Sequence, residues 1–209
     1  GDVYKRQGQT RTAFDVSIIS FDLSSDGSSI LAGVEAKSGT QSLAKFVLRD
    51  DDTVTLEGKT SAMGFVVDAP FSPRFAPNGK TALVLNSGGF SDGILDDVLV
   101  VDIIKNVVVD RVAQVSDGLE SLAIHPSGEF AVIACLNAMP WSVTSHLAVI
   151  SLTSGSAELL YSLPVEAVPE GIEFSNNGKQ LFVGSTLANH ISVYAVEDMM
   201  LERSPFVLP

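Results

Sequence analysis

The sequence is poor in cysteine, in aromatic residues and in positive charge. Its single cysteine, Cys135, excludes an internal disulfide framework and lies in an apolar segment, which predicts a packed thiol. Lysine and arginine number 13 against 25 aspartates and glutamates, a net charge of −12 at pH 7, which disfavours nucleic acid and anionic membranes as partners. No apolar run is long enough to be a membrane span. Small molecules, cations and basic protein surfaces remain as partners.

What the sequence does contain is one unit repeated four times. Each copy has a short apolar segment, a turn that ends in glycine and a second apolar segment, and the turn glycines lie about 50 residues apart along the chain. These glycines are Gly27, Gly79, Gly128 and Gly178. A period of this length held over four copies predicts a repeat architecture.

The turns and the segments around them predict strands. Pro77-Asn78-Gly79 and Pro126-Ser127-Gly128 combine a proline, a small polar residue and a glycine, which favour a type I turn followed by positive φ. Continuous apolar runs of strand length, at 83–85, 98–101 and 181–183, indicate strands that are covered on both faces. Sheets of this kind, without crossover helices, stack around a ring, so the predicted fold is all-β, a β-propeller.

Several motifs resemble a known family of propellers. Pro169-Glu170-Gly171-Ile172, the turn at Gly178 and Asn189-His190-Ile191-Ser192-Val193 resemble the repeat of the YVTN family, and His125-Pro126-Ser127-Gly128 resembles the turn of the related lactonase-like propellers. The resemblance spans nearly all of 18–209. It implies a ring of about seven blades, a first strand that lines the central channel, and a periplasmic or secreted location. It says less about function, because this fold hosts many unrelated activities.

The sequence accounts for about four blades of four antiparallel strands. We place them at about 18–62, 71–116, 120–165 and 170–209, within one domain at 8–209, and expect the last strand of the fourth blade at 199–207. An open arc exposes two apolar blade faces, so we interpret the chain as a fragment of a larger ring, with a closed ring of four blades as the alternative. Residues 1–7 begin without methionine and resemble a translated sequencing adapter, so they are left out of the predicted fold.

Ionisable side chains recur at two matched positions of the repeat. Glu120 and Glu170 begin first strands, and His146 and His190 begin third strands. The second strand returns the chain, so the starts of strands one and three lie at the same end of a blade, roughly 10 Å apart. One interpretation makes the glutamates acid/base or metal-binding groups and the histidines metal ligands or proton carriers. The other is that all four solvate a rim.

Two further residues are candidates for ligand binding near the channel. Arg74 lies in a first strand and could supply a cation to the channel, or it could pair across a blade interface with Asp22 or Glu173. Trp141, the single tryptophan, lies in the link between the second and third strands of the third blade. It is either a ligand-facing anchor or a plug over the end of the core.

The acidic, glycine-rich link at 86–97 is a third candidate. Asp97, with Asp92 and Asp96, could hold a divalent cation such as Ca²⁺ through oxygen ligands, and a flexible polar loop is the alternative. The link also contains a G-x-S-x-G match around Ser91, but a strand-like segment follows where a nucleophile elbow needs a helix. His125 lies at a turn and is interpreted as structural. No other cofactor motif is identified.

Three functions are compatible with these features. We favour a binding or scaffolding propeller that takes a small molecule or a protein on the face carrying the starts of the first strands, because the repeats are regular and no complete catalytic set is present. The alternative is a lactone hydrolase, which rests on the lactonase-like turn and the glutamate and histidine pairs. A redox-cofactor propeller is the third possibility, and it needs a cofactor pocket that the sequence does not identify.

Overall fold

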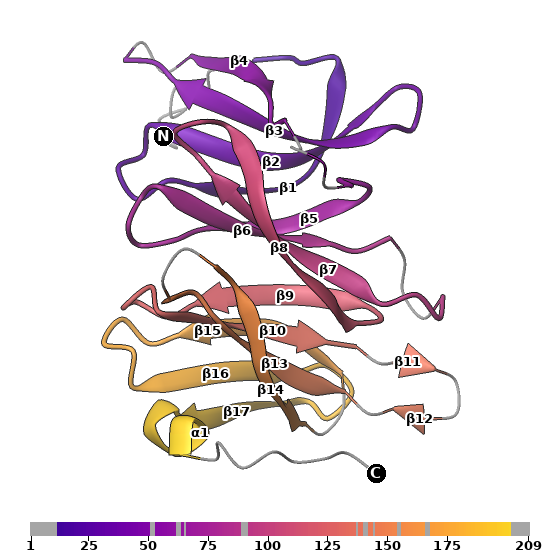
Figure 1. Cartoon of the computed structure of the whole chain (residues 1–209), viewed down its shortest axis with the longest axis vertical. Coiled ribbons are helices and arrows are strands. Elements are labelled where there is room, and N and C mark those ends of the chain that lie inside the picture. Colours follow the sequence, from indigo (N-terminus) through magenta and orange to yellow (C-terminus); the bar gives the residue numbers. More distant parts are fainter. Residues whose placement is uncertain are drawn as a thin grey trace, which may run out of the picture.

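The four repeats fold into four antiparallel sheets that follow one another along a curved stack (Figure 1). The structure is a computed structural model, and it describes residues 12–50, 53–61, 64, 66–88, 92–136, 138–139, 142–143, 145–153, 156–165 and 168–201. The all-β prediction is confirmed, and the architecture is that of a partial β-propeller with one sheet, or blade, for each repeat. The described part of the chain has no helix long and apolar enough to cross a membrane.

The first three blades each contain four strands in simple up-and-down order. Blade 1 consists of β1 (Val16–Leu23), β2 (Ser29–Ala36), β3 (Gln41–Leu48) and β4 (Val54–Lys59). Blade 2 consists of β5 (Pro70–Phe75), β6 (Thr81–Asn86), β7 (Asp96–Asp102) and β8 (Val107–Ser116). Blade 3 consists of β9 (Leu119–Ile124), β10 (Phe130–Cys135), β13 (His146–Ser151) and β14 (Glu158–Pro164), with the small hairpin β11 (Ala138–Met139) and β12 (Ser142–Val143) between its second and third strands.

Blade 4 differs from this plan. Its described residues form three strands, β15 (Pro169–Phe174), β16 (Gln180–Ser185) and β17 (His190–Ala195), and then the short helix α1 (Val196–Leu201). The prediction of a strand at 199–207 is therefore wrong for 199–201, which are helical. Residues 202–209 lie outside the described residues. Val196 and Met199, three positions apart on the helix, are buried in the core shared with blade 3, which favours a helix over a strand at this point.

The first strand of every blade lies on the inside of the arc. β1 contacts β5, β5 contacts β9, and β9 contacts β15, so these four strands form a continuous inner wall. The other strands of each blade follow outward in chain order. Residues at equivalent positions of the four first strands therefore face the same inner space, which is the channel of the propeller.

The blades are held together by three apolar layers. The middle strand β6 shows why the apolar runs are continuous: Ala82 and Val84 pack toward blade 1, whereas Leu83 and Leu85 pack toward blade 3. Successive side chains of a strand point to opposite faces, so a strand buried on both faces needs an apolar residue at every position. The third layer joins blades 3 and 4 in the same way, around Val132 of β10.

Both ends of the arc expose apolar side chains. On the outer face of blade 1, Val34 and Phe46 are buried in a cluster that includes Phe14, but Phe21 and Leu23 on the same face remain 60% and 47% exposed. On the outer face of blade 4, Phe182, Ile191 and Val193 remain 37%, 69% and 52% exposed. The apolar face expected at an open end of the arc is thus present on both blade 1 and blade 4.

His125 joins the turns of blades 3 and 4. Its Nε2 lies 3.0 Å from the carbonyl oxygen of Gly178, so Nε2 carries the proton and donates, while Nδ1 accepts from the backbone N–H of Ser127 at 3.1 Å. The imidazole also stacks on Phe130 and meets the edge of Phe174. These contacts give His125 a structural place between two blades, in keeping with its interpretation from the sequence.

Candidate functional site at the channel mouth

A β-bulge sets the position of both channel glutamates. In β9 the residues on either side of Glu120 pair with consecutive residues of β10, so Glu120 is an extra residue with no partner across the ladder. The same irregularity in β15 leaves Glu170 unpaired across from β16, and in β1 it leaves Ile19 unpaired. A bulge turns the extra residue out of the normal alternation of the strand. Blades 1, 3 and 4 therefore present one side chain each at the same place in the repeat.

The two glutamates are electrostatically coupled. Glu120 is half-buried, and its pKa is raised, first by loss of solvent around the carboxyl and second by the negative charge of Glu170. Glu170 is exposed at the rim. Within the described part of the chain, neither carboxylate takes part in a hydrogen bond or an ion pair. The pair is thus a local concentration of negative charge that no described residue neutralises.

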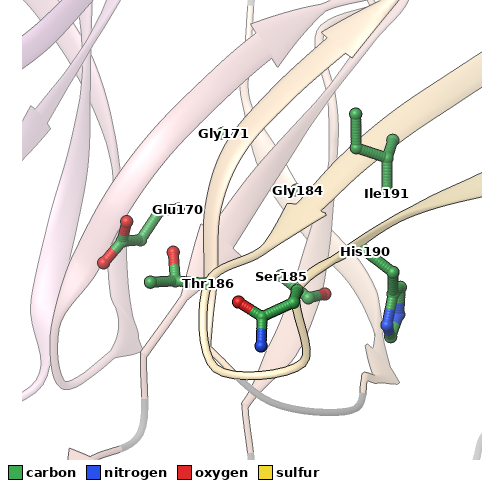
Figure 2. A pocket seen from close by; sticks show the side chains of 8 residues that line it. Glu170, Gly171, Gly184, Ser185, Thr186, His190 and Ile191 are labelled. Atoms are coloured by element: carbon green, nitrogen blue, oxygen red, sulfur yellow. The ribbon is translucent and has the colours of Figure 1, made fainter.

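A cavity of about 430 Å³ opens beside Glu170, at the end of blade 4 where β15 and β17 begin. Figure 2 shows Glu170 and His190 at opposite sides of this cavity, with Ser185 and Thr186 between them. The His190 ring bonds to the hydroxyl of Ser192 through Nε2, at 3.1 Å, and Nδ1 lies 3.3 Å from the carbonyl oxygen of Ala188. The described residues lining the cavity are Glu170, Gly171, Gly184, Ser185, Thr186, Asn189, His190 and Ile191.

The structure brings some of the predicted residues together and separates others. Glu120 and Glu170 lie on the neighbouring strands β9 and β15, and Glu170 shares a cavity with His190. His146 begins β13, where it is half-buried and pairs in the ladder with Cys135 and Pro164; it is not among the described residues that line the Glu170 cavity. Trp141 lies outside the described residues, so its role as anchor or plug stays a prediction.

Arg74 lies at the other end of the channel. A second cavity, of about 200 Å³, is lined by the first strands of all four blades, with Asp22, Arg74, Ala123 and Glu173 at equivalent positions. The Arg74 guanidinium donates to the carbonyl oxygen of Pro73 at 3.1 Å. Among the described residues it forms no ion pair with Asp22 or Glu173. Arg74 faces the channel, therefore, but away from the channel glutamates.

Two aspartates of the acidic link in blade 2, Asp96 and Asp97, accept hydrogen bonds from nearby side chains and backbone N–H groups. Asp97 accepts from Arg111 Nη1 at 3.1 Å and from the backbone N–H of Gln114 at 2.8 Å. The buried Asp96 accepts from the Ser87 hydroxyl and from the backbone N–H of Gly118, both at 2.9 Å. The described residues contain no group of three or more His, Cys, Asp or Glu side chains placed to hold a metal ion. Ligand binding by Asp97 stays a prediction.

The polar residues of the cavity wall were not anticipated from the sequence. Ser185 ends β16, and Thr186 and Asn189 belong to the turn between β16 and β17, which brings them beside Glu170. The only sequence signal for them is their place just before His190 in the fourth repeat. The bulge itself has no sequence signature, because it depends on how the first strand pairs with the second.

Comparison with known proteins identifies the fold only. No family profile and no curated protein matches the sequence. Among solved structures, the chain is similar to a putative 6-phosphogluconolactonase from Bacteroides uniformis (TM-score 0.66, 18% identity, 86% of this chain and 50% of that one) and to another from Bacteroides fragilis (0.61, 16%, 86% and 51%). It is also similar to hydrazine synthase from Kuenenia stuttgartiensis (0.68, 19%, 88% and 54%). The chain spans about half the length of these structures.

Proposed function

We propose that this chain is part of a ligand-binding propeller, of the YVTN type that its motifs resemble. We further propose that the channel mouth, the end of the channel where Glu120, Glu170 and the cavity beside Glu170 lie, takes a small ligand with a positive charge. The observation that carries the proposal is the shared bulge, which places Glu120 and Glu170 on neighbouring first strands, where neither has a counter-ion among the described residues. The net charge of −12 adds a general attraction for cations.

The coupling of the two glutamates favours a cation over a neutral or anionic ligand. Negative charge on Glu170 raises the pKa of Glu120, so the pair repels when both groups are ionised. A cation between them offsets that repulsion, and it gains more from Glu120 because that carboxylate is partly removed from water. Thr186 and Asn189, which are exposed, supply a hydroxyl and an amide group that can bond to the rest of the ligand.

Calorimetric titration tests the proposal with two separate probes, agmatine as an organic cation and CaCl₂ as a metal ion. We expect at least one probe to bind the wild-type chain and to bind the Glu120→Gln/Glu170→Gln variant at least ten times more weakly. Glu173→Gln is the matched control, because Glu173 lies on the same strand as Glu170 but at the other end of the channel. Absence of binding by both probes, or equal affinity in the double variant, would overturn the proposal.

Lactone hydrolysis is the second candidate. It is favoured by the cavity shared by Glu170 and His190 and by the likeness in fold to proteins described as putative 6-phosphogluconolactonases. In this reaction Glu170 takes a proton from water, the oxygen attacks the lactone carbonyl, and the tetrahedral intermediate breaks the ring C–O bond. His190, when protonated, gives its proton to the leaving alkoxide, and the product is the open hydroxy acid.

The charge of the site argues against a phosphorylated substrate. The described residues at this mouth include two glutamates and neither lysine nor arginine, whereas a phosphate group needs cationic partners. We therefore expect any hydrolysis to favour uncharged lactones. Proton release from glucono-δ-lactone measures it, and Glu170→Gln and His190→Ala should each abolish turnover with little change in melting temperature. Full turnover in both variants would exclude this site as the catalytic one.

A further inference from the structure

One position of the repeat recurs at the channel mouth in all four blades. Ile19, Phe71, Glu120 and Glu170 each lie at the same distance before the turn glycine of their blade. In blades 1, 3 and 4 this residue is the extra residue of the bulge, whereas Phe71 pairs with Leu85 and the irregularity of β5 follows it. The four first strands contact one another in blade order, so two apolar residues are followed by two acidic ones along the inner wall.

A cavity opens in the apolar half of the mouth, at Ile19 and Phe71. It has a volume of about 220 Å³, and Ile19, Ala69, Pro70 and Phe71 are among the residues that line it. Ile19 is 40% exposed and Phe71 is half-buried. This cavity and the one beside Glu170 lie at the same end of their blades, because residues that begin first and third strands line both.

The two cavities differ in charge. The described residues that line the cavity at Ile19 include no ionisable side chain, whereas those that line the other include Glu170 and His190. Neither set includes a lysine or an arginine, so neither cavity offers a partner for an anionic group. A ligand that uses both halves of the mouth is therefore cationic at one end and apolar at the other.

The packing of the blades sets the length of such a ligand. Phe71 and Glu120 belong to β5 and β9, which contact each other. Sheets packed face to face lie roughly 10 Å apart, so one small molecule can place an apolar group on Phe71 and a positive charge at Glu120. Ile19 extends the apolar half by one blade, and Glu170 extends the acidic half by one blade.

We propose that the channel mouth binds an organic amine with an apolar body. The ammonium group lies at Glu120 and Glu170, and the apolar body fills the cavity at Ile19 and Phe71. This inference rests on the proposed function and adds the chemical class of the ligand to it. The two glutamates attract the ammonium group, while the apolar body gains affinity because it leaves water. A metal ion or a fully polar cation uses the acidic half alone.

Three ligands of matched structure test the proposal on the full chain by calorimetric titration. Octylamine has both features, ethylamine keeps the ammonium group but has a much shorter apolar part, and octanoate keeps the apolar chain but carries the opposite charge. We expect octylamine to bind at least tenfold more tightly than either of the others. Equal affinity for octylamine and octanoate would overturn the proposal, as would absence of octylamine binding.

The failure of this proposal can be told from the failure of the proposed function. Equal affinity for the two amines, both weakened in the Glu120→Gln/Glu170→Gln variant, would overturn the apolar half alone and leave the cation site standing. The same holds if agmatine or CaCl₂ binds through the glutamates and octylamine does not bind. Only if agmatine and CaCl₂ also fail does the cation site fall with it.

Two protein variants locate the apolar part of the site. Ile19→Ser should lower the preference of the chain for octylamine over ethylamine at least fivefold. Ile18→Ser is the matched control and should change it less than twofold, because Ile18 is 44% exposed, pairs with Val34 and is not among the described residues that line the cavity. Equal effects of the two substitutions, or no effect of Ile19→Ser, would overturn the proposal.

Discussion

Polar contacts join blade 1 to blade 2 and blade 3 to blade 4, but different residues of the repeat make them. At the first, polar side chains of the inner strand hold the next blade: the Ser20 hydroxyl accepts from the backbone N–H of Ser72 at 2.9 Å, and Asp22 accepts from that of Phe75 at 2.8 Å. At the second, the equivalent residues are Ser121, whose buried hydroxyl oxygen has no hydrogen-bond partner among the described residues, and Ala123.

The polar contact between blades 3 and 4 has moved from the inner strands to the turns, where His125 bonds to Gly178. Among the described residues, the polar side chains of the inner strands of blades 3 and 4 form no hydrogen bond to a neighbouring blade. The bulges of the inner strands also differ between the two halves of the arc. The extra residue is the apolar Ile19 in blade 1, but it is Glu120 in blade 3 and Glu170 in blade 4. The comparison teaches that inner-strand polar groups join the blades in one half of the arc, whereas in the other half the described groups at the same positions do not.

The largest effect should come from breaking the turn contact between blades 3 and 4. A Cβ at Gly178, where φ is +69°, would overlap the imidazole of His125, so Gly178→Ala should lower the free energy of unfolding by about 3 kcal/mol. Gly27→Ala is the matched control: Gly27 has φ of +72° with open space around it, and we expect a loss of about 1 kcal/mol. Urea unfolding measures both, and equal losses would show that the contact with His125 contributes nothing.

The second-largest effect is expected from loss of the hydrogen bond that joins the inner strands of blades 1 and 2. Asp22→Ala removes the acceptor for the backbone N–H of Phe75 and should cost about 1–3 kcal/mol in urea unfolding. Glu173 occupies the equivalent position in blade 4, is exposed and accepts no hydrogen bond among the described residues, so Glu173→Ala should change stability by less than about 0.5 kcal/mol. Similar losses of unfolding free energy in the two variants would show that this inner-strand position stabilises both halves of the arc equally.

The smallest effect concerns the pH dependence of the channel mouth. The pKa of Glu120 is raised in the folded chain above its usual value of 4.5, so the folded chain holds this proton more tightly than the unfolded chain does. Its contribution to stability is therefore full below pH 4.5 and declines as the pH rises through the raised pKa. Glu120→Gln removes the decline, so the variant should match the wild type at pH 4 and exceed it at pH 8 by less than about 1 kcal/mol.

Urea unfolding of both proteins at the two pH values checks this prediction. Glu173→Gln serves again as the control and should show no such change between pH 4 and pH 8. A Glu120→Gln variant that loses stability relative to the wild type at pH 8 would mean that the ionised carboxylate stabilises the fold. Glu120 would then stabilise the assembly of the blades, as Asp22 does between blades 1 and 2.

Much of the fold follows from local patterns. The turn at Gly128, with φ of +75°, and the apolar run of β6 are readable because turn chemistry and two-sided burial each leave a mark within a few residues. The end of blade 4 was misread because Met199, Met200 and Leu201 are as compatible with a strand as with a helix. Docking of Val196 and Met199 against blade 3 decides for the helix.

The candidate site was predicted only in part. The matched positions of Glu120 and Glu170 in the repeat place them at one end of neighbouring blades, and the structure has them close enough to interact. His190 shares a cavity with Glu170, whereas Asp97 pairs with Arg111 across the β7–β8 ladder. That ion pair could not be foreseen, since it depends on the register between two strands and on a bulge within them.

The sequence by itself determined that this chain is a repeat of small antiparallel sheets buried on both faces, because period, turn residues and apolar runs are local properties. Only the tertiary structure decided which polar residues hold blades together and which remain free. Hydrogen bonds such as those of Asp22 and His125 join residues about 50 positions apart, and they form only when neighbouring blades pack at a particular spacing and register.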